Sequence, residues 1–380
     1  MLLGELLSRS ARLHPDDLPD QLRQAAERAG AAAVEILVVD LAQRNLLPLL
    51  PGDHRNSMPV VGSVAGDAYR QVTAIDVPGV DGVRRWVPIL DSAERVGVLG
   101  VTVAEGTALE PWWQLASLAG ELFVAKARYG DRLSLRRRTR STTVAAEMRW
   151  SLLPPLSFRS ERLTVSGILE PAYEIAGDTF DYAVNGDTAH LALLDAMGHG
   201  LEASRMANVA VTSYRHSRRA GLSLPDTAVA MDEVVQACFD ASRYVTGQLA
   251  TLDLSTGMFR MLNMGHPLPL LIRDGRVVGE LPSEPMLPAG WGDKPAAIYE
   301  HRLQPGDHVL MYTDGITEAK HPGGDEYQLG RLVNVIETVL ARAAPVEELL
   351  RAIIEDVMAF QDFHARDDAT ALAVGYHPPH

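Results

Sequence analysis

The chain has 380 residues, of which 47% are hydrophobic and 22% are charged, and its formal net charge is −14. This composition is typical of a globular protein with two or three domains, and neither a nucleic acid nor a membrane is expected as a partner, because the balance is acidic and no run approaches the roughly 18 apolar residues of a membrane span. The single cysteine, Cys238, excludes an internal disulfide and a zinc site built from several cysteines.

Residues 1–125 are predicted to form a small mixed domain. The first stretch, MLLGELLSRSARLHPDD, interrupts its apolar part with charges and lacks a cleavage site, so it is not a secretory signal and the protein is expected to be cytoplasmic. A helical segment, DLPDQLRQAAERAG, precedes strand-like runs in AAAVEILVVDL and RRWVPILDSAERVGVLGVTVAEG. The order of VVDLAQRNLLPLLPG, AGDAYRQ and WVPILDSAERVGVLGVTV resembles the GAF family. The resemblance implies an α/β sensory domain that binds a ligand or serves for dimerisation.

Residues 126–154 are predicted to be a helical linker. From Glu110 to Pro154 leucines and alanines recur at three- and four-residue spacing, and Pro154 and Pro155 end the pattern. The basic stretch LRRRTR is too polar to bury and is interpreted as a solvated helix face rather than a nucleic-acid arm. The apolar stripe is therefore expected to meet a partner helix or the next domain in a coiled-coil-like seam. A homodimer through the N-terminal domain and the linker is predicted, with a plain helical linker as the alternative.

Residues 155–380 are rich in short strand-like runs, among them HLALLDA, MFRMLNM, HVLMYTD and ATALAVGY. Helical stretches lie between them, and one of these, MDEVVQACFDAS, places Cys238 at a spacing that predicts a core position. Hairpin-linked strands without regular strand-helix alternation predict an α+β fold, an antiparallel β-sandwich flanked by helices. Neither a dinucleotide-binding glycine motif nor a P-loop follows any strand, which disfavours a doubly wound nucleotide-binding sheet.

Acidic residues recur where the apolar runs end. They are Asp178 in EIAGDTFDY, Asp195 in LLDAMGHG, Asp314 in MYTDG, and the adjacent Asp367 and Asp368 in ARDDATALAV. An isolated buried carboxylate is costly, and the cost is removed if several converge on a cation. Oxygen ligands without thiolates or clustered histidines suit Mg²⁺ or Mn²⁺, and two such ions can activate water for attack on phosphorus. The sequence therefore predicts a hydrolase that needs no protein nucleophile.

Six motifs occur in a fixed order: SLLPP, AGDTFDY, LLDAMGHGLEAS, LDLSTGMFRMLNMGHPLPLL, GDHVLMYTDGITEA and DDAT. With these motifs the chain resembles the metal-dependent serine/threonine phosphatases of the type 2C (PPM) superfamily, specifically the bacterial branch of stress-response and sporulation regulators. The resemblance implies a pair of Mn²⁺ or Mg²⁺ ions held by Asp178, Asp195, Asp314 and Asp367, with Asp195 bridging them. It also implies a ligand from the backbone carbonyl of Ala196, where relatives often have glycine.

Several assignments remain open from the sequence. Asp368 is an alternative to Asp367, because adjacent acids cannot be separated without coordinates. Asp181 either supports the metal ligands or caps a turn. His199 and His266 lie near the proposed site, where a histidine could protonate the leaving oxygen, but bracing of the loops is the favoured interpretation.

The predicted function is dephosphorylation of phosphoserine or phosphothreonine. The bacterial branch implies that the substrate is a small phosphorylated anti-sigma factor antagonist in a partner-switching pathway, an analogy weaker than the chemistry. Three alternatives are a signalling scaffold that kept the fold without turnover, a phosphatase for a small metabolite or nucleotide, and a main function of the N-terminal domain as a small-molecule receptor.

Overall fold

The computed structural model describes residues 2–50, 57–80, 82–171, 177–292, 297–342, 344–365 and 367–377. The chain divides into two compact units, Met1–Ser141 and Thr142–His380, each with its own sheets and core. The quoted motifs include residues that lie outside the described ranges, namely Pro51, Gly52, Glu174, Ile175, Ala176 and Arg366. Within the described ranges, none of the helices combines the length and apolar character needed to cross a membrane.

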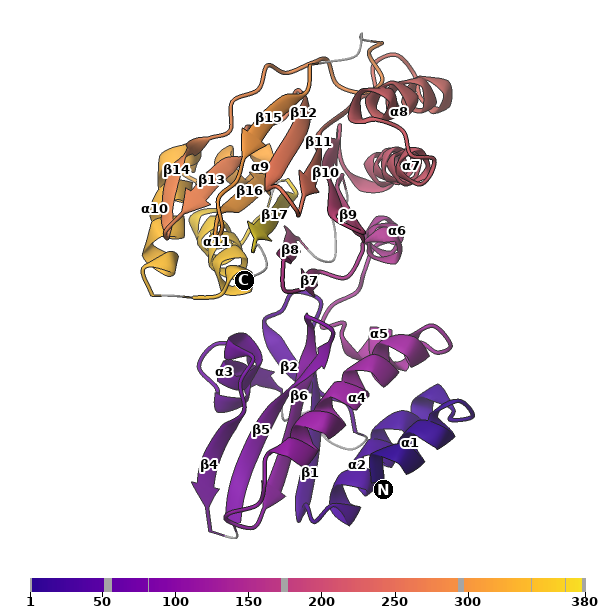
Figure 1. Ribbon diagram of the computed structural model, residues 1–380, viewed down its shortest axis with the longest axis vertical. Coiled ribbons are helices and arrows are strands. Elements are labelled where there is room, and N and C mark those ends of the chain that lie inside the picture. Colours follow the sequence, from indigo (N-terminus) through magenta and orange to yellow (C-terminus); the bar gives the residue numbers. More distant parts are fainter. Residues whose placement is uncertain are drawn as a thin grey trace. The chain divides into compact units, whose positions relative to one another are not determined.

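The N-terminal unit contains one six-stranded antiparallel sheet with the strand order β3-β2-β1-β6-β5-β4 (Figure 1). Its strands are β1 (Ala33–Val39), β2 (Asn45–Pro48), β3 (Met58–Pro59), β4 (Ile75–Gly79), β5 (Gly82–Asp91) and β6 (Glu94–Val103). Its helices are α1 (Leu2–Ser10), the 3-10 turn η1 (Pro15–Asp17), α2 (Leu18–Arg28), α3 (Val64–Gln71), α4 (Glu110–Ala127) and α5 (Arg132–Arg136).

Both faces of this sheet are covered, which explains why the buried part of β1, from Ile36 to Val39, is apolar at every position. Ile36 and Val38 pack into a cluster with residues of α2 and α4. Leu37 and Val39 point to the opposite face and pack into a second cluster with residues of α3. Successive side chains of a strand alternate between the two faces, so a strand covered on both sides needs apolar residues at every position.

The predicted helical linker is not one continuous helix. Helix α4 ends at Ala127, α5 is a separate short helix, and α6 (Val144–Leu152) belongs to the C-terminal unit. Leu115 and Leu122 of α4 are buried in the core of the N-terminal unit. The predicted coiled-coil-like seam is therefore wrong for α4, because its apolar stripe is already covered by the sheet beneath it.

The basic stretch that follows α4 also packs within the N-terminal unit. The backbone N–H of Leu41 donates to the carbonyl of Arg137 at 3.0 Å. The guanidinium Nε of Arg137 donates to the carbonyl of Val39 at 3.1 Å. These bonds tie the stretch to the end of β1, so part of its positive charge serves a local structural purpose.

The C-terminal unit is a sandwich of two antiparallel sheets, with the orders β15-β12-β11-β10-β9 and β14-β13-β16-β17-β8-β7 (Figure 1). The strands of the first sheet are β9 (Asp178–Asn185), β10 (Thr188–Ala196), β11 (Val245–Asp253), β12 (Met258–Met264) and β15 (Tyr299–Arg302). Those of the second are β7 (Ser157–Arg159), β8 (Leu163–Glu170), β13 (Leu270–Arg273), β14 (Arg276–Glu280), β16 (His308–Tyr312) and β17 (Ala369–Tyr376).

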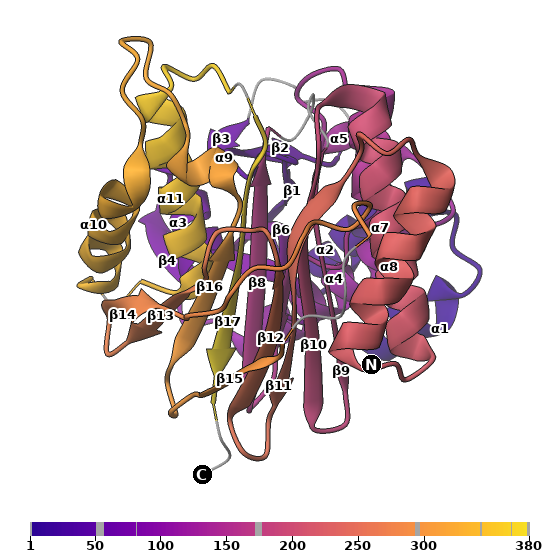
Figure 2. The same ribbon diagram turned by 90° about the horizontal axis from the view of Figure 1, so that it is seen from above.

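Helices cover the outer faces of the sandwich. Figure 2 shows α7 (Gly200–Arg219) and α8 (Leu224–Cys238) on one side, and α10 (Gln328–Leu340) and α11 (Val346–Phe360) on the other, with the strands between them. The short helix α9 (Asp314–Thr317) follows β16 directly. The prediction of an α+β antiparallel sandwich flanked by helices is confirmed for this unit.

The alternation within β10 shows how the sequence builds these layers. Leu191 and Leu193 belong to the apolar cluster between the two sheets. Ala192 and Leu194 point the other way, into the cluster beneath α7 and α8. A strand buried on both faces accounts for the unbroken apolar run LALL.

The predicted core position of Cys238 is wrong, because this residue is exposed. Helix α8 buries Ala228, Met231 and Val235 at helical spacing and ends at Cys238. The chain then turns into an extended conformation at Phe239, which packs against the core in place of the cysteine. The helical spacing of apolar residues extends to Cys238, but the last residue that α8 buries against the core is Val235.

Candidate functional site

Two of the predicted acids continue the inward-facing stripes of neighbouring strands. Asp195 follows Leu191 and Leu193 at two-residue spacing on β10, and Asp178 precedes the core residue Phe180 by two on β9. Both carboxylates therefore face the space between the sheets. In the antiparallel register Asp195 lies directly opposite Asp178. Like charges in that relation repel, so the sandwich core ends in an electrostatically unfavourable pair.

The second sheet meets this pair through two threonines. Thr313 follows the core residue Met311 on β16, and Thr370 precedes the core residue Leu372 on β17. The hydroxyl of Thr313 donates to Oδ2 of Asp178 at 2.8 Å and accepts from the backbone N–H of Thr370 at 3.0 Å. Asp178 is thus held by a residue that lies 135 positions away in the sequence.

Asp314 and Asp367 come from the loops at the same end of the second sheet. Asp314 begins α9 after β16, and Asp367 lies two residues before β17. The residue after Asp314 must be glycine, because a Cβ on Gly315 would lie 1.8 Å from the carbonyl oxygen of Asp368. This close approach brings the two loops together.

The pKa values of the four acids are all raised, by burial and, for Asp178 and Asp195, by the charges of neighbouring acids. Burial, followed by the charges of Asp314 and Asp367, raises the pKa of Asp195 to about 7. Burial, followed by the charges of Asp195 and Asp368, raises the pKa of Asp178 well above its ordinary value. Partial desolvation of the carboxyl groups also raises the pKa values of Asp314 and Asp367. Carboxylates from both sheets therefore share one electrostatic environment that disfavours their ionisation.

The adjacent acids Asp367 and Asp368 have different environments. Asp368 is buried: its Oδ1 accepts from Nη1 of Arg149 at 2.9 Å, and its Oδ2 accepts from the backbone N–H of Gly177 at 2.6 Å and of Asp178 at 3.2 Å. Asp367 is exposed, and its Oδ1 accepts from the backbone N–H of Asp368 at 2.9 Å. Because both oxygens of Asp368 already accept hydrogen bonds from Arg149 and the backbone, the geometry favours Asp367 as the residue offered to a cation.

Arg149 is the residue of this region that the sequence reasoning missed. It lies on α6, where the other buried residues are Ala145 and Ala146. A charged side chain three to four residues from two buried alanines on a helix is the signal that could have identified it, because such a charge must find a partner.

Asp181 does not join the acidic group. It lies three residues after Asp178 on β9, so its side chain points to the opposite face of the sheet. Its Oδ1 accepts from Arg215 Nη2 at 2.5 Å and its Oδ2 accepts from Arg218 Nη1 at 2.7 Å, both on α7. Asp181 therefore neither caps a turn nor supports the acids, and it anchors α7 to the sheet.

The two histidines also differ. His199 is exposed at the N-terminus of α7, and its side chain makes no capping hydrogen bond there. Burial lowers the pKa of His266 to about 4, so its ring is neutral near pH 7. The backbone N–H of His266 donates to Oδ1 of Asn263 at 2.8 Å, and Nδ2 of Asn263 donates back to the carbonyl of His266 at 2.9 Å. His266 thus braces its loop, which agrees with the favoured interpretation.

The donor chemistry of the acidic group fits a hard divalent cation. In the described ranges, no group of three or more histidine, cysteine, aspartate or glutamate side chains is placed to hold a metal ion by itself. Mg²⁺ needs no such cage, because it is usually bound through one or two carboxylates and keeps several water ligands. The carbonyl oxygen of Ala196, which lies 2.9 Å from the position of a Cβ on Gly177, can add a backbone oxygen to this set.

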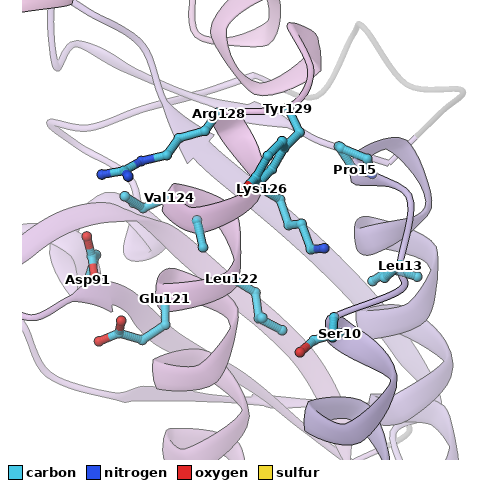
Figure 3. Close-up of a pocket in the computed structure, with 12 residues that line it drawn as sticks. Ser10, Leu13, Pro15, Asp91, Glu121, Leu122, Val124, Lys126, Arg128 and Tyr129 are labelled. Carbon is cyan, nitrogen blue, oxygen red and sulfur yellow. The ribbon is translucent and has the colours of Figure 1, made fainter.

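The N-terminal unit contains a cavity of about 700 Å³ beside α4 (Figure 3). Its lining includes the apolar side chains of Leu13 and Leu122, the carboxylates of Asp91 and Glu121, and the ammonium group of Lys126. Burial, followed by the charge of Glu121, raises the pKa of Asp91. The cavity offers both apolar surface and charges of both signs.

Known protein families and structures include several that are similar to this chain. The family model for stage II sporulation protein E matches residues 185–377. Phosphoserine phosphatase RsbU of Bacillus subtilis (strain 168) is 22% identical over 232 residues, which are 61% of this chain and 68% of RsbU.

Two solved structures have similar folds. The RsbU and RsbW domains of Rv1364c from Mycobacterium tuberculosis match with 25% identity and a TM-score of 0.51, over 58% of this chain and 62% of that one. The SiaA-PP2C domain of Pseudomonas aeruginosa matches with 21% identity and a TM-score of 0.51, over 61% of this chain and 94% of the domain. The chain thus spans less than two thirds of the Mycobacterium tuberculosis chain and slightly more than two thirds of RsbU.

Proposed function

Because the chain belongs to the family of stage II sporulation protein E, we propose that its C-terminal unit hydrolyses phosphoserine or phosphothreonine in another protein with the help of two divalent metal ions. By family and fold, this unit is a protein serine/threonine phosphatase with the PP2C fold. Its site residues and its substrate are part of the proposal.

The observation that carries the proposal is the gathering of carboxylates at the end of the sandwich core. Asp178 and Asp195 face each other across two paired strands, and the pKa of Asp195 is raised to about 7 by burial and by further acids. Such a group is unstable when ionised unless a cation is bound. A folded protein that keeps several buried acids together is best explained by a function that needs their charge.

Asp178, Asp195, Asp314, Asp367 and the carbonyl of Ala196 are the proposed ligands of two Mn²⁺ or Mg²⁺ ions. When bound, such a pair of ions lowers the pKa of water to produce a nucleophile and stabilises charge on the phosphoryl oxygens. Asp195 is paired with Asp178 across the two strands, and the charges of Asp314 and Asp367 act on its carboxyl group, which supports the bridging role that the resemblance implies. Asp367 is exposed and would face the entering substrate.

The chain's own residues keep this site ordered. The hydroxyl of Thr313 orients the carboxyl group of Asp178 by donating to its Oδ2. The side chain of Asn263 braces the loop after β12 through the backbone of His266. The ring of His266 is buried and neutral near pH 7, so a general-acid role for this residue is not part of the proposal. The leaving serine or threonine oxygen would take its proton from solvent at the exposed edge of the site.

The proposed substrate is a phosphorylated regulatory protein, an anti-sigma factor antagonist in a partner-switching pathway. The support is the relationship to RsbU, which is named a phosphoserine phosphatase, and to a structure that contains an RsbU and an RsbW domain. We further propose that the N-terminal unit is a GAF-like sensory domain, that it mediates homodimerisation together with the linker region, and that the protein works in the cytoplasm.

The first test is metal-dependent phosphate release by the full chain. After treatment with a chelator, the protein is expected to release phosphate from a phosphoserine peptide only when Mn²⁺ or Mg²⁺ is added back. Asp195→Asn is expected to abolish most of this release. Asp274→Asn is its matched control, because it makes the same chemical change in an exposed two-residue turn where the φ of 50° suits asparagine. Absence of release from phosphoserine and phosphothreonine peptides with either metal would favour the scaffold without turnover.

Two further measurements test the metabolite-phosphatase and receptor functions. A comparison of phosphate release from the peptide and from a nucleoside monophosphate distinguishes a protein phosphatase from a metabolite phosphatase. The cavity beside α4 gives a receptor function of the N-terminal unit a defined place. Replacing Leu122, which lines the cavity, with tryptophan would fill part of it, and a ligand-dependent change in phosphatase activity that this variant loses would support that function.

A further inference from the structure

Arg149 connects three parts of the C-terminal unit that are far apart in the sequence. Its side chain is only 2% exposed, and the Asp368 side chain that it contacts is 1% exposed. Nη1 of Arg149 donates to Oδ1 of Asp368 at 2.9 Å, and Nη2 donates to the carbonyl of Pro171 at 2.5 Å. One guanidinium therefore joins α6, the residue after β8 and the residue before β17.

The other oxygen of Asp368 acts on the start of β9. Oδ2 accepts from the backbone N–H groups of Gly177 and Asp178, at 2.6 and 3.2 Å. The carbonyl of Gly177 in turn accepts from the backbone N–H of Ala196 at 3.1 Å. The position of the Asp178 backbone relative to Asp195 and Ala196 thus depends on a carboxylate that is itself oriented by Arg149.

We propose that Arg149 is a positioning residue for the metal-binding acids: by fixing Asp368, it holds Gly177 and Asp178 in the register that places Asp178 opposite Asp195. The inference rests on the proposed function, because it assumes that these acids bind divalent cations. It adds a residue from α6, outside the residues matched by the family model, to the machinery of the site.

Helix α6 is itself fixed, which makes it a suitable support. The hydroxyl of Thr143 caps its first turn by accepting from the backbone N–H of Ala146 at 3.1 Å. The hydroxyl of Ser204 on α7 donates to the carbonyl of Ala145 at 3.0 Å. The guanidinium therefore projects from a short helix that is bonded to α7, whose N-terminus begins four residues after Ala196.

Removing Arg149 should change the Mn²⁺ affinity in opposite directions depending on whether the residue acts through its charge or by positioning Asp368, which makes the proposal testable. If Arg149 acted only through its charge, its loss would leave the site more negative and Mn²⁺ would bind more tightly. If it acts by positioning, its loss releases Asp368 and the start of β9, and Mn²⁺ binds more weakly. The direction of the change in Mn²⁺ affinity separates the two.

A matched control in the same unit tests whether Arg149 only stabilises the fold or also positions the metal-binding acids. Arg351 on α11 also forms a buried ion pair, in which Nη2 donates to Oε2 of Glu348 at 2.8 Å and the side chains are 10% and 6% exposed. Arg351→Met makes the same chemical change as Arg149→Met on the helix layer over the second sheet. It is expected to destabilise the fold without changing the affinity for Mn²⁺.

The experiment measures Mn²⁺ binding to the full chain by calorimetry, together with chemical denaturation of each variant. Arg149→Met is expected to weaken Mn²⁺ binding by about 10- to 100-fold, the usual effect of losing a residue that orients metal ligands. Arg149→Lys keeps a charged donor for Asp368 and is expected to recover most of the affinity. Arg149→Gln, which lacks the charge, replaces Arg149→Met if that variant does not fold, and it is also expected to bind Mn²⁺ more weakly.

The outcomes are distinct. Unchanged or tighter Mn²⁺ binding by the folded Arg149→Met variant, or by Arg149→Gln where it replaces Arg149→Met, would overturn the positioning role while leaving the proposed function intact. An equal loss of affinity in Arg351→Met would overturn it too. If the unmodified protein binds neither Mn²⁺ nor Mg²⁺, the proposed function itself fails and this inference fails with it. Weaker binding in Arg149→Met, with recovery in Arg149→Lys and none lost in Arg351→Met, supports the proposal.

Discussion

Two aspartates on the same strand, Asp178 and Asp181, have opposite surroundings. Both are buried on β9. Asp181 points toward α7 and receives the guanidinium groups of Arg215 and Arg218. Asp178 points between the sheets, where it accepts from the hydroxyl of Thr313 and where burial, followed by the charges of Asp195 and Asp368, raises its pKa.

The difference teaches how a structural acid can be distinguished from a functional one. The charge of Asp181 is balanced within the chain, so its contribution is expected to appear in stability. The charge of Asp178 is opposed by its neighbours, so the fold tolerates the site at a cost that a bound cation would remove. Substitutions on the two faces should therefore separate activity from stability.

The largest expected effect is on the functional face. Asp195→Asn is expected to lower kcat/KM for a phosphopeptide by about a thousandfold, equivalent to about 4 kcal/mol of transition-state stabilisation. The reason is that asparagine removes the charge opposite Asp178 while keeping the shape of the side chain. Phosphate release with saturating Mn²⁺ measures the change, and denaturation checks that the variant folds. An activity within a few-fold of the unmodified protein would show that the acidic group does not carry the chemistry.

Substitution of Asp181, on the face of β9 that points toward α7, is expected to change the stability of the fold rather than the activity. Asp181→Asn leaves the guanidinium groups of Arg215 and Arg218 without their carboxylate and is expected to lower the free energy of unfolding by about 3 kcal/mol. Once folded and saturated with Mn²⁺, the variant should retain nearly full activity. Urea denaturation and the same phosphopeptide assay measure both quantities. A large loss of kcat in a fully folded Asp181→Asn protein would remove the contrast between the two faces.

A smaller effect is expected from pH in the metal-free protein. The folded-state pKa of Asp195 is raised to about 7, above its ordinary value of 3.8, so the folded state binds this proton more tightly than the unfolded state. The resulting stability is present at acid pH and is lost as the pH rises, by about 2 kcal/mol between about pH 5 and pH 7. Mn²⁺ should restore it at pH 7.

Comparison of the metal-free protein with Asp195→Asn isolates this contribution. The variant should show a pH dependence that is shallower by the same amount, since asparagine does not titrate. Thermal unfolding at a series of pH values, with and without Mn²⁺, provides the measurement. Parallel stability curves for the two proteins across this range would contradict the raised pKa.

Local sequence patterns predicted much of the C-terminal unit. The runs MFRMLNM and ATALAVGY are the strands β12 and β17 with the predicted bounds. The turn at Asp274 and Gly275 joins β13 and β14, and the positive φ values of both residues are those that such a two-residue hairpin requires. Alternation, turn residues and helical spacing are properties of neighbouring residues, so they can be recognised without knowing the fold.

The same reasoning failed where a pattern extended beyond its packing surface. The helical spacing in α8 continued to Cys238, but the helix ends there and Phe239 takes the place in the core. The leucines of α4 indicated a seam with a partner helix, whereas they are buried in their own unit. Periodicity identifies an apolar face, but it does not identify the surface that covers it.

The sequence by itself determined that acids stand at the ends of buried strands, and therefore which residue types were available for a metal site. Only the tertiary structure decided that Asp178 lies opposite Asp195, that Asp368 rather than Asp367 pairs with Arg149, and that Asp181 serves α7. The physical reason is that strand register, the face of a sheet and the partner of a buried charge depend on contacts between segments distant in sequence. Local propensity carries no information about those contacts, and packing and electrostatics select them when the sheets come together.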